Sequence, residues 1–406
     1  MIYSNLGSQN KNVTFYCKLF DEGIEMSYMD EYIGKGLTSV QLEDELMKLI
    51  NRYDEITGKH LFLYSVDLNQ HGVPNDLSID DLYTIKDILR NDESEKLSFY
   101  IETPGGSGEA TEQIAKFLRT KYEYVDFIVV GECKSAGTIL VMCGDKIYLN
   151  DTGSLGPIDA QMQIGRFYGS AHDYMSWVED KMKEANQYGH LNPFDALMVA
   201  QIAPNELVGV QHNLDFGKEL VTNFLRDYKF KNWVATETEG TLVDDDFKQR
   251  RAEEIAERLA DHSQWKSHGR ALKIDTLQKL GLKIENLSED LEVCELVERM
   301  QVLLRLIFSS SPSFKIMADK NTKLVRNAVA STDVSPREVS SHPPYIIFNI
   351  ICNNCGKEFK YYVNLIGNPL VDEDLQNQGI MPLPKENIIV CDCGTELDLS
   401  QIKNNI

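Results

Sequence analysis

The sequence lacks any run of about 18 consecutive apolar residues, the length that a membrane-spanning helix needs. Its N-terminal segment also lacks a basic end followed by an apolar stretch, which is the pattern of a secretory signal. There is no G-x-x-x-x-G-K-[ST] loop that would bind a nucleotide. We therefore expect a cytoplasmic protein that does not enter a membrane, and we expect any energy-dependent delivery of a substrate to come from a partner protein.

Basic residues are scarce relative to acidic ones. The 406-residue chain has 41 Lys and Arg against 63 Asp and Glu, which gives a formal net charge of −22 at pH 7. A surface of this sign repels phosphate backbones at long range, and the sequence has no segregated basic patch, so binding to nucleic acid is disfavoured. The hydrophobic content of 42% is typical of a globular protein, and the length suffices for two domains.

Cysteine is also sparse, with eight residues, too few for a disulfide framework in a chain of this length. Four of them are scattered, and we interpret these as small buried hydrophobic residues: Cys17, Cys133, Cys143 and Cys294. Nothing in the sequence around Cys133 would activate its thiol, although it lies close to Ser135. The other four form two closely spaced pairs near the C-terminus.

The stretch 97–161 repeats one structural unit. Apolar residues alternate in LSFYI, which predicts a strand, and a Pro-Gly-Gly turn at 104–106 precedes an amphipathic helical pattern. A second apolar run, 127–130, leads to Ser135 and another apolar helix, and a third strand is predicted at 146–149. With a further buried strand predicted at 60–66, these units predict a parallel sheet covered by helices on both faces.

The two turns offer complementary chemistry. A glycine pair lets backbone amides approach a ligand closely, and the start of the next helix adds partial positive charge, so the first turn can hold an oxyanion. A serine at a sharp turn between a strand and a helix exposes its hydroxyl, as a nucleophile requires. Most such turns are ordinary loops or helix caps when they occur alone. Their occurrence in this order, with GSLGP after them, indicates acyl-transfer chemistry.

Several motifs resemble those of the serine dehydrogenase proteinase family, which is related to signal peptide peptidase A and, more distantly, to the Clp protease. They are ETPGG at 102–106, KSAGT at 134–138, LGPID at 155–159 and, late in the chain, WKSHGR at 265–270. A weaker likeness extends over about residues 60–287. The resemblance implies that Ser135 is the nucleophile and that the amides of Gly106 and Ala136 form the oxyanion hole.

The resemblance also implies an α/β fold of the Clp protease/crotonase type. We expect four parts along the chain: a serine protease domain at 1–290, a docking helix at 291–309, a linker at 310–341 and a small zinc ribbon at 342–406. The docking helix is expected from an apolar stripe in LEVCELVERMQVLLRLIFS. The linker is expected because 310–341 has no clear periodicity. Related folds assemble into rings or stacked trimers, so a homo-oligomer is implied.

The sequence offers several candidates for the base that would activate Ser135. In the Clp type a histidine lies in the segment that corresponds to 155–161, but here that segment has no histidine and Asp159 stands there instead. A carboxylate is a poor base for serine at neutral pH unless burial raises its pKa. A desolvated lysine is therefore predicted, as in the signal-peptide-peptidase type, with Lys183 as the first candidate and Lys218 as the second.

Asp159 and two histidines remain alternative candidates for the base. His172 lies between the serine segment and the candidate lysines. His268 lies in the polar run HSQWKSHGR, and we expect it to have a structural role or to line a peptide groove.

The two C-terminal cysteine pairs predict a metal site. Each pair ends in glycine within a hairpin pattern, so that two thiolates of each turn can reach one ion: Cys352 and Cys355, then Cys391 and Cys393. Four thiolates suit a tetrahedral zinc ion, although the second pair is one residue shorter than the usual zinc-ribbon knuckle. Such a closed site is structural, and we expect this acidic ribbon to contact a protein, for example a regulatory or substrate-delivering partner.

The sequence thus predicts a serine peptidase that cleaves polypeptides through an acyl-enzyme on Ser135. A non-catalytic scaffold that binds peptides with the same fold is the main alternative, because the histidine of the Clp type is missing. An acyl-coenzyme A enzyme of the crotonase type is a third possibility, but that chemistry does not need a serine at this turn.

Overall fold

The computed structural model describes residues 27–164, 167–236, 240–328, 345–364, 369–384 and 386–400. The chain divides into two compact units, Met1–Ala328 and Val329–Ile406. Of the scattered cysteines, Cys133, Cys143 and Cys294 are buried as predicted, whereas Cys17 lies outside the described residues.

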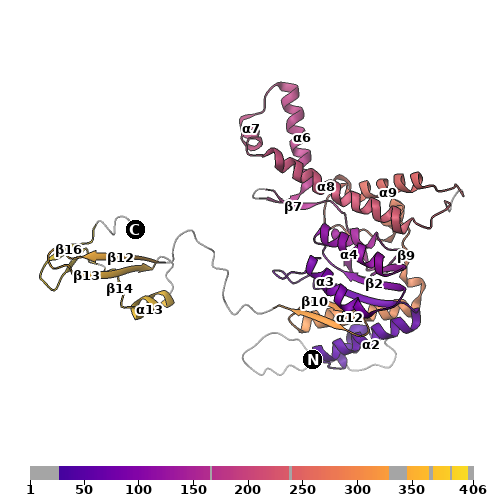
Figure 1. Cartoon of the computed structure of the whole chain (residues 1–406), viewed down its shortest axis with the longest axis horizontal. Helices are drawn as coiled ribbons and strands as arrows, with labels where there is room; N and C mark the ends of the chain where they lie inside the picture. Colours follow the sequence, from indigo (N-terminus) through magenta and orange to yellow (C-terminus); the bar gives the residue numbers. More distant parts are fainter. Residues whose placement is uncertain are drawn as a thin grey trace, which may run out of the picture. The chain divides into compact units, whose positions relative to one another are not determined.

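A seven-stranded sheet forms the centre of the first unit, with the strand order β11-β10-β1-β2-β3-β5-β9 (Figure 1). Five neighbouring strands pair in parallel: β1 (His60–Val66), β2 (Lys96–Glu102), β3 (Tyr124–Val129), β5 (Lys146–Leu149) and β9 (Glu285–Asn286). Two strands join antiparallel at one edge: β10 (Ser313–Ala318) and β11 (Lys323–Asn327). The predicted α/β class with a largely parallel sheet is therefore confirmed.

The sheet has an apolar core on each face, because side chains of a strand alternate between the faces. Phe62, Phe99 and Phe127 point to one face. This core includes residues of α3 (Ile79–Ile88), α4 (Gly108–Lys121), α5 (Ala136–Val141) and α9 (Asp245–Ala260). Tyr100 and Ile128 point to the other face, where α2 (Ser39–Thr57) and α12 (Leu291–Ser310) pack. Thr38 caps the N-terminus of α2 and forms a capping box with Gln41.

The region after residue 290 differs from the sequence interpretation. The apolar stripe of α12 exists, but it packs on the second face of the sheet and is buried within the unit, so α12 is not a free docking helix. Residues 313–327 form β10 and β11 of the central sheet, whereas the sequence predicted a linker there. The strand β10 contains a fully buried Lys315, which interrupts its apolar pattern and explains why periodicity did not reveal it.

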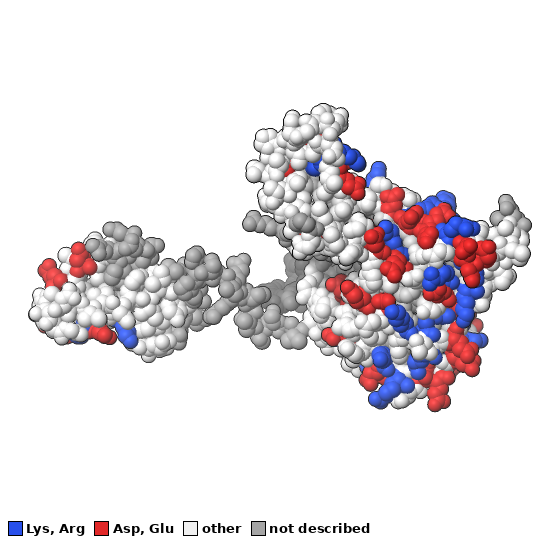
Figure 2. Space-filling view, turned by 45° about the horizontal axis from the view of Figure 1, so that its top comes forward, with Lys and Arg blue, Asp and Glu red and all other residues white. Residues whose placement is uncertain are grey.

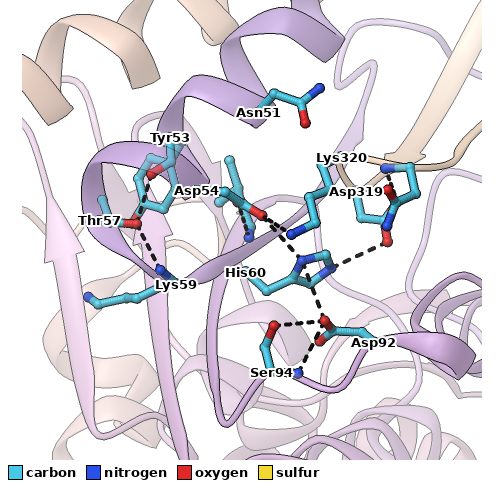
Figure 3. A network of polar contacts seen from close by, with 12 residues as sticks. Asn51, Tyr53, Asp54, Thr57, Lys59, His60, Asp92, Ser94, Asp319 and Lys320 are labelled. Carbon is cyan, nitrogen blue, oxygen red and sulfur yellow. Dashed lines mark hydrogen bonds and ion pairs between the residues drawn. The ribbon is translucent and has the colours of Figure 1, made fainter.

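A buried histidine links four elements at the N-terminal edge of the parallel strands. Figure 3 shows His60 at the start of β1 surrounded by the carboxylates of Asp54, Asp92 and Asp319. Its Nδ1 lies 3.3 Å from Asp54 and 3.7 Å from Asp92, and its Nε2 lies 3.3 Å from Asp319. Lys320 lies 3.3 Å from Asp54 on the same side. These ion pairs connect α2, β1, the turn before β2 and the turn between β10 and β11.

A helical arm extends from the sheet in Figure 1. It comprises the hairpin β7 (Gln161–Ile164) and β8 (Phe167–Ser170), then α6 (Ala171–Tyr188), α7 (Pro193–Val199) and α8 (Pro204–Phe224). Figure 2 shows few charged side chains on the lobe formed by α6 and α7, whereas both signs of charge cover the visible face of the sheet region. Exposed apolar residues on this arm are Met182, Tyr188, Phe194, Leu197, Met198 and Val208. In the described part of the chain, no helix is long and apolar enough to cross a bilayer.

Short elements complete the first unit: α1 (Tyr28–Gly34), η1 (Leu89–Asn91), β4 (Glu132–Cys133), β6 (Ser154–Leu155), η2 (Leu225–Lys229), α10 (His262–Trp265), α11 (Ile274–Leu280) and η3 (Leu287–Glu289). The second unit contains two hairpins and one helix. Its elements are β12 (Tyr345–Ile351), β13 (Glu358–Asn364), α13 (Pro369–Asn377), β14 (Met381–Pro382), β15 (Ile388–Val390) and β16 (Glu396–Asp398). The β12–β13 and β15–β16 hairpins carry the two cysteine pairs at their turns.

Candidate functional site

Ser135 lies at a sharp turn between a strand and a helix. After β3 and the short strand β4, the chain turns at Ser135, and α5 begins at the next residue. The backbone of Ser135 has φ 49° and ψ −118°, and Lys266 is the one other described non-glycine residue with positive φ. Such a conformation costs about 1–3 kcal/mol and is typical of turns that present a nucleophile. Ser135 is half-buried, so its hydroxyl is accessible to a ligand.

The Pro-Gly-Gly turn packs directly against Ser135. A Cβ on Gly105 would lie 2.7 Å from Cβ of Ser135 and 3.3 Å from the amide nitrogen of Ala136. Ala136 is the first residue of α5, so its amide has no partner within the helix. Among the hydrogen bonds of the described residues, none has the amide of Gly106 or Ala136 as its donor. Two free amides beside a serine hydroxyl are the arrangement that stabilises a tetrahedral oxyanion.

Asp159 is buried and binds two histidines from a distant part of the sequence. Its Oδ1 lies 2.8 Å from Nδ1 of His268, and its Oδ2 lies 2.8 Å from Nδ1 of His262. Burial raises the pKa of Asp159, but the interactions with His268 and His262 outweigh burial, and the net pKa lies below its ordinary value. The carboxylate is therefore charged at neutral pH and is able to orient an imidazole.

The two histidines differ at their second ring nitrogen. Nε2 of His262 lies 3.3 Å from a carboxylate oxygen of Asp173, so both nitrogens of this ring face carboxylates. No hydrogen bond or ion pair with a described residue involves Nε2 of His268, whose side chain is 27% exposed. An imidazole held at Nδ1 by a carboxylate, with Nε2 open, has the geometry of a general base. His172 lies next to His262, with ring centres 6.1 Å apart.

Lys134 connects the serine turn to the segment that carries His268. Its buried Nζ donates to the carbonyls of Leu155 and Arg270, at 3.3 and 3.4 Å. Arg270 is two residues from His268, and Lys134 is the direct neighbour of Ser135. Burial lowers the pKa of the Lys134 ammonium, which also donates to the hydroxyl of Ser154 at 3.1 Å. The lysine thus ties the histidine segment to the serine turn.

The serine turn, the glycine turn and Asp159 lie inside one segment of the chain that is shared with known proteins. Residues 67–214 match the family of ClpP-like SDH-type serine proteinases. The resemblance inferred from the sequence is thereby confirmed, together with the Clp-like character of the fold. His262 and His268 lie beyond the matched segment of this serine proteinase family.

Comparisons with individual proteins find relatives of low sequence identity. The chain is similar to an uncharacterized protein of Methanocaldococcus jannaschii, with 25% identity over 210 residues, or 52% of this chain and 60% of that protein. The chain therefore spans less than two thirds of the length of this curated relative. It is also similar to two solved structures of alanine mutants of the membrane-bound stomatin-specific protease 1510-N. Their TM-scores are 0.31 and 0.32, with 14% and 15% identity, and the matches cover 55% of this chain and 79% and 75% of those chains.

The two lysines predicted as bases lie on the helical arm. Lys183 belongs to α6, its side chain is 72% exposed, and its Nζ pairs with Asp180 at 3.2 Å. Lys218 belongs to α8 and pairs with Asp215 at 2.9 Å. Among the hydrogen bonds and ion pairs of the described residues, none joins Ser135 to Lys183, Lys218 or His268. Both lysines pair with acidic residues of their own helices.

Sequence reasoning named Asp159 and His268 separately but did not pair them. They are 109 positions apart, and nothing in the local pattern of either segment predicts that they meet. His262 was not a candidate at all. The available signal was the occurrence of two histidines six positions apart in one polar run, after a predicted parallel sheet with no histidine near Asp159.

The four C-terminal cysteines come together within the second unit. Their Sγ atoms all lie within 4.8 Å of one another, with Cys355 and Cys391 at 3.5 Å and Cys352 and Cys393 at 3.6 Å. Thiolates placed tetrahedrally about 2.3 Å from a zinc ion would be roughly 3.8 Å apart, whereas the sulfurs of a disulfide are about 2.05 Å apart. The predicted ligand set is thus brought together, and its spacing fits one metal ion.

Each cysteine pair is shaped by a tight turn that ends in glycine. The amide of Gly356 donates to the carbonyl of Cys352 at 2.9 Å, and the amide of Gly394 donates to the carbonyl of Cys391 at 2.7 Å. Both glycines have positive φ, 74° and 85°. Glycine adopts this conformation without the steric cost that a side chain brings, so the turns can aim two sulfurs at the same point.

Proposed function

We propose that the protein is a serine peptidase that cleaves polypeptides through an acyl-enzyme on Ser135. The observation that carries this proposal is the contact of 2.8 Å between buried Asp159 and Nδ1 of His268, in a unit that also presents a serine at a strained turn. The match to a serine proteinase family supports a peptidase over the crotonase-type chemistry.

His268 is the proposed base in place of the lysines. Its Nε2 would accept the proton of the Ser135 hydroxyl while Oγ attacks the carbonyl carbon of the peptide bond, and Asp159 would hold the resulting imidazolium. When the tetrahedral intermediate collapses, the C–N bond breaks and the imidazolium returns its proton to the leaving amine. Water activated by the same imidazole would then hydrolyse the ester on Ser135 and release the second product.

The proposed oxyanion hole consists of the amides of Gly106 and Ala136. The turn that contains Gly106 packs against Ser135 through Gly105, and Ala136 directly follows Ser135. Neither amide has a described partner, so both are free to donate to the carbonyl oxygen as it becomes negative. Loss of one such donor typically lowers the rate about 100- to 1000-fold. The turn supplies these donors from the backbone, which makes the site independent of side-chain motion.

His262 is proposed to support His268 through the shared carboxylate. With both of its nitrogens facing Asp159 and Asp173, it is poorly suited to accept a proton from serine. It occupies the second oxygen of Asp159 and leaves the first for His268.

We further propose that the four-cysteine site holds a structural Zn²⁺. Cys352, Cys355, Cys391 and Cys393 would be its ligands, and the ion would join the β12–β13 hairpin to the β15–β16 hairpin. The small apolar core of this unit consists of residues from the first hairpin and α13 and its following turn, and includes none from the second hairpin. A site closed by four thiolates has no open position for a substrate. Its proposed role is therefore to fold the second unit, which would then be available to contact a protein.

The test is covalent labelling of the full chain with a fluorophosphonate probe, read by intact mass. Wild type should gain one adduct, and Ser135→Ala should gain none. Lys183→Ala and Lys218→Ala should be labelled at the wild-type rate, while His268→Ala should not be labelled measurably. A folded wild type that gains no adduct would contradict the peptidase and favour the peptide-binding scaffold.

A further inference from the structure

Leu77, which lies outside the glycine turn of the proposed oxyanion hole, holds this turn in place. Gly105 and Gly106 have φ of 116° and 150°, which residues with side chains rarely adopt. A Cβ on Gly106 would lie 2.3 Å from the carbonyl oxygen of Leu77, so the backbone of Leu77 lies directly against the turn. The turn is thus confined between Leu77 on one side and Ser135 on the other.

Leu77 determines the direction of the Gly106 amide. Its own amide donates to the carbonyl of Gly105 at 2.7 Å, and its carbonyl accepts from the amide of Ser107 at 2.9 Å. In such a parallel bridge the residue between the two bonded ones directs its own amide away from the neighbouring strand. The amide of Gly106 is therefore directed away from Leu77, and it has no partner among the described residues.

A buried ion pair fixes both neighbours of Leu77. Nζ of Lys315 donates to the carbonyl of Asp76 at 2.9 Å and contacts the two carboxylate oxygens of Asp81 at 3.0 and 2.9 Å. The same carboxylate accepts from the amide of Ser78 at 2.9 Å. The side chains of Lys315 and Asp81 are both 0% exposed. The residues before and after Leu77 are thus bound to one rigid pair.

The sheet brings Lys315 to the edge where the catalytic turns lie. It belongs to β10, where it stands opposite Val66, the last residue of β1. The C-terminal ends of parallel strands meet at one edge of a sheet, and Glu102, the last residue of β2, is separated from the Pro-Gly-Gly segment at that edge by Thr103 alone. The hydroxyl of Tyr64 also donates to Asp81, at 3.2 Å, which adds a contact from β1.

Stability alone gives little reason for this buried pair. Removing two charges from water costs several kcal/mol per ion, and well-packed apolar residues of similar volume are often as stable or more so. The contacts of the pair with the backbone around Leu77 supply a different reason. They are directional, and they end at the turn that offers an oxyanion donor.

We propose that Lys315, together with Asp81, is a positioning residue for the oxyanion hole. It fixes residues 76–78, these fix the glycine turn, and the turn directs the amide of Gly106 toward the carbonyl oxygen of the substrate. Lys315 does not touch the substrate in this scheme. The inference rests on the proposed function, since it concerns the rate of reaction at Ser135.

The test compares two double variants of the full chain. Lys315→Met with Asp81→Asn removes the positioning pair, and Lys59→Met with Asp126→Asn removes a matched pair, 2.5 Å apart, at the opposite edge of the same sheet. Asp126 is fully buried, and neither variant leaves an unpaired buried charge. The measured quantities are the maximal rate of fluorophosphonate labelling and the probe concentration that gives half of this rate.

We expect the Lys315 variant to label about 10- to 100-fold more slowly at saturation, with the half-saturating concentration changed less than about twofold. The Lys59 variant should stay within about threefold of wild type in both quantities, because its pair does not contact the glycine turn. Lys315→Arg with native Asp81 should recover part of the rate. A folded Lys315 variant that labels at the wild-type rate would overturn the inference.

Amide hydrogen exchange gives a readout that does not depend on activity. The amides of Leu77 and Ser107 should exchange at least about tenfold faster in the Lys315 variant and not in the Lys59 variant, while amides of β2 and β3 stay protected. Faster exchange throughout the sheet would mean that the pair only stabilises the fold, and this would also overturn the inference. If wild type is not labelled at all, the proposed function fails, and the exchange at these two amides decides the positioning role by itself.

Discussion

Oδ1 of Asp159 lies 2.8 Å from Nδ1 of His268, across 109 positions of the sequence. The aspartate is the last residue of the LGPID motif, and the histidine follows α10, so two separate segments must fold before this pair exists. A buried, ionised carboxylate next to Nδ1 favours the imidazole tautomer with the proton on Nδ1 and the lone pair on Nε2.

Substitution at this pair should lower reactivity without unfolding the protein. His268→Gln keeps a donor for Asp159 but has no basic nitrogen, so fluorophosphonate labelling of Ser135 should fall about 100- to 10,000-fold. In Asp159→Asn the labelling rate should fall by a similar factor, because an amide at this position favours the wrong tautomer of the His268 imidazole. Labelling rates would be measured with circular dichroism spectra as a control for folding. His262→Gln is the matched variant on the other oxygen, and a larger loss there than at His268 would reverse the assignment of the base.

The sequence predicted more of the fold than of the site. The strands predicted at 60–66, 97–101, 127–130 and 146–149 correspond to β1, β2, β3 and β5, because apolar runs and alternation are local signals. The strand β10 was not predicted because the buried Lys315, the proposed positioning residue, interrupts its pattern of apolar residues. The sequence favoured a lysine dyad, because the base that we propose, His268, lies far outside the segment 155–161 in which the Clp type carries its histidine. Contacts such as that between Asp159 and His268 depend on how distant loops pack against each other. Local sequence patterns carry no information on that packing.

Stability should fall as the pH rises through the range in which His60 loses its proton. Burial lowers the pKa of His60, but ion pairs with Asp319, Asp54 and Asp92 outweigh burial and raise the pKa from 6.5 to about 9. The folded-state pKa is above the unfolded one, so the contribution is complete below pH 6.5 and disappears as the pH rises to about 9. Its size is on the order of 3 kcal/mol.

Thermal unfolding of wild type and His60→Leu across this pH range would measure the effect. Wild type should lose stability between pH 6.5 and 9, whereas the variant, already destabilised, should change much less over the same interval. Parallel curves for the two proteins would show that another group titrates. Lys320 also faces Asp54, so Lys320→Ala is a control that should keep the pH dependence of wild type.

Removal of one thiolate ligand should unfold the second unit and leave the first intact. Cys393→Ser is expected to lower bound zinc from about one ion per chain to less than about a tenth of that value, because a tetrahedral site with three thiolates binds zinc far more weakly. Metal content by mass spectrometry and hydrogen exchange of residues 345–400 would be measured. Cys294→Ser, a buried thiol of α12, is the control. Full zinc content in Cys393→Ser would exclude this cysteine as a ligand.

Charge placed on the helical arm should weaken self-association. Phe194 and Leu197 of α7 are 71% and 68% exposed, and the face of the lobe that is visible in Figure 2 has few charged side chains. Exposed apolar side chains on such a face are typical of protein contacts. We propose a second copy of the chain as the contact, in keeping with a homo-oligomeric peptidase. Phe194→Glu with Leu197→Glu should reduce the molar mass measured by light scattering at least about twofold, since burying two carboxylates in an apolar interface is unfavourable.

The control for the arm is Leu242→Glu. Leu242 is also a strongly exposed apolar residue, with 84% exposure, but it lies outside α6, α7 and α8. The molar mass of this variant should equal that of wild type. The arm packs on α9 mainly through α8, and Phe194 and Leu197 belong to neither apolar core of the sheet, so the double variant should keep its unfolding temperature. A wild type that is monomeric at all concentrations, or a double variant with unchanged mass, would contradict the contact. In the second case the apolar lobe would be left available for the polypeptide substrate, and labelling of Ser135 in competition with an unfolded protein would become the next measurement.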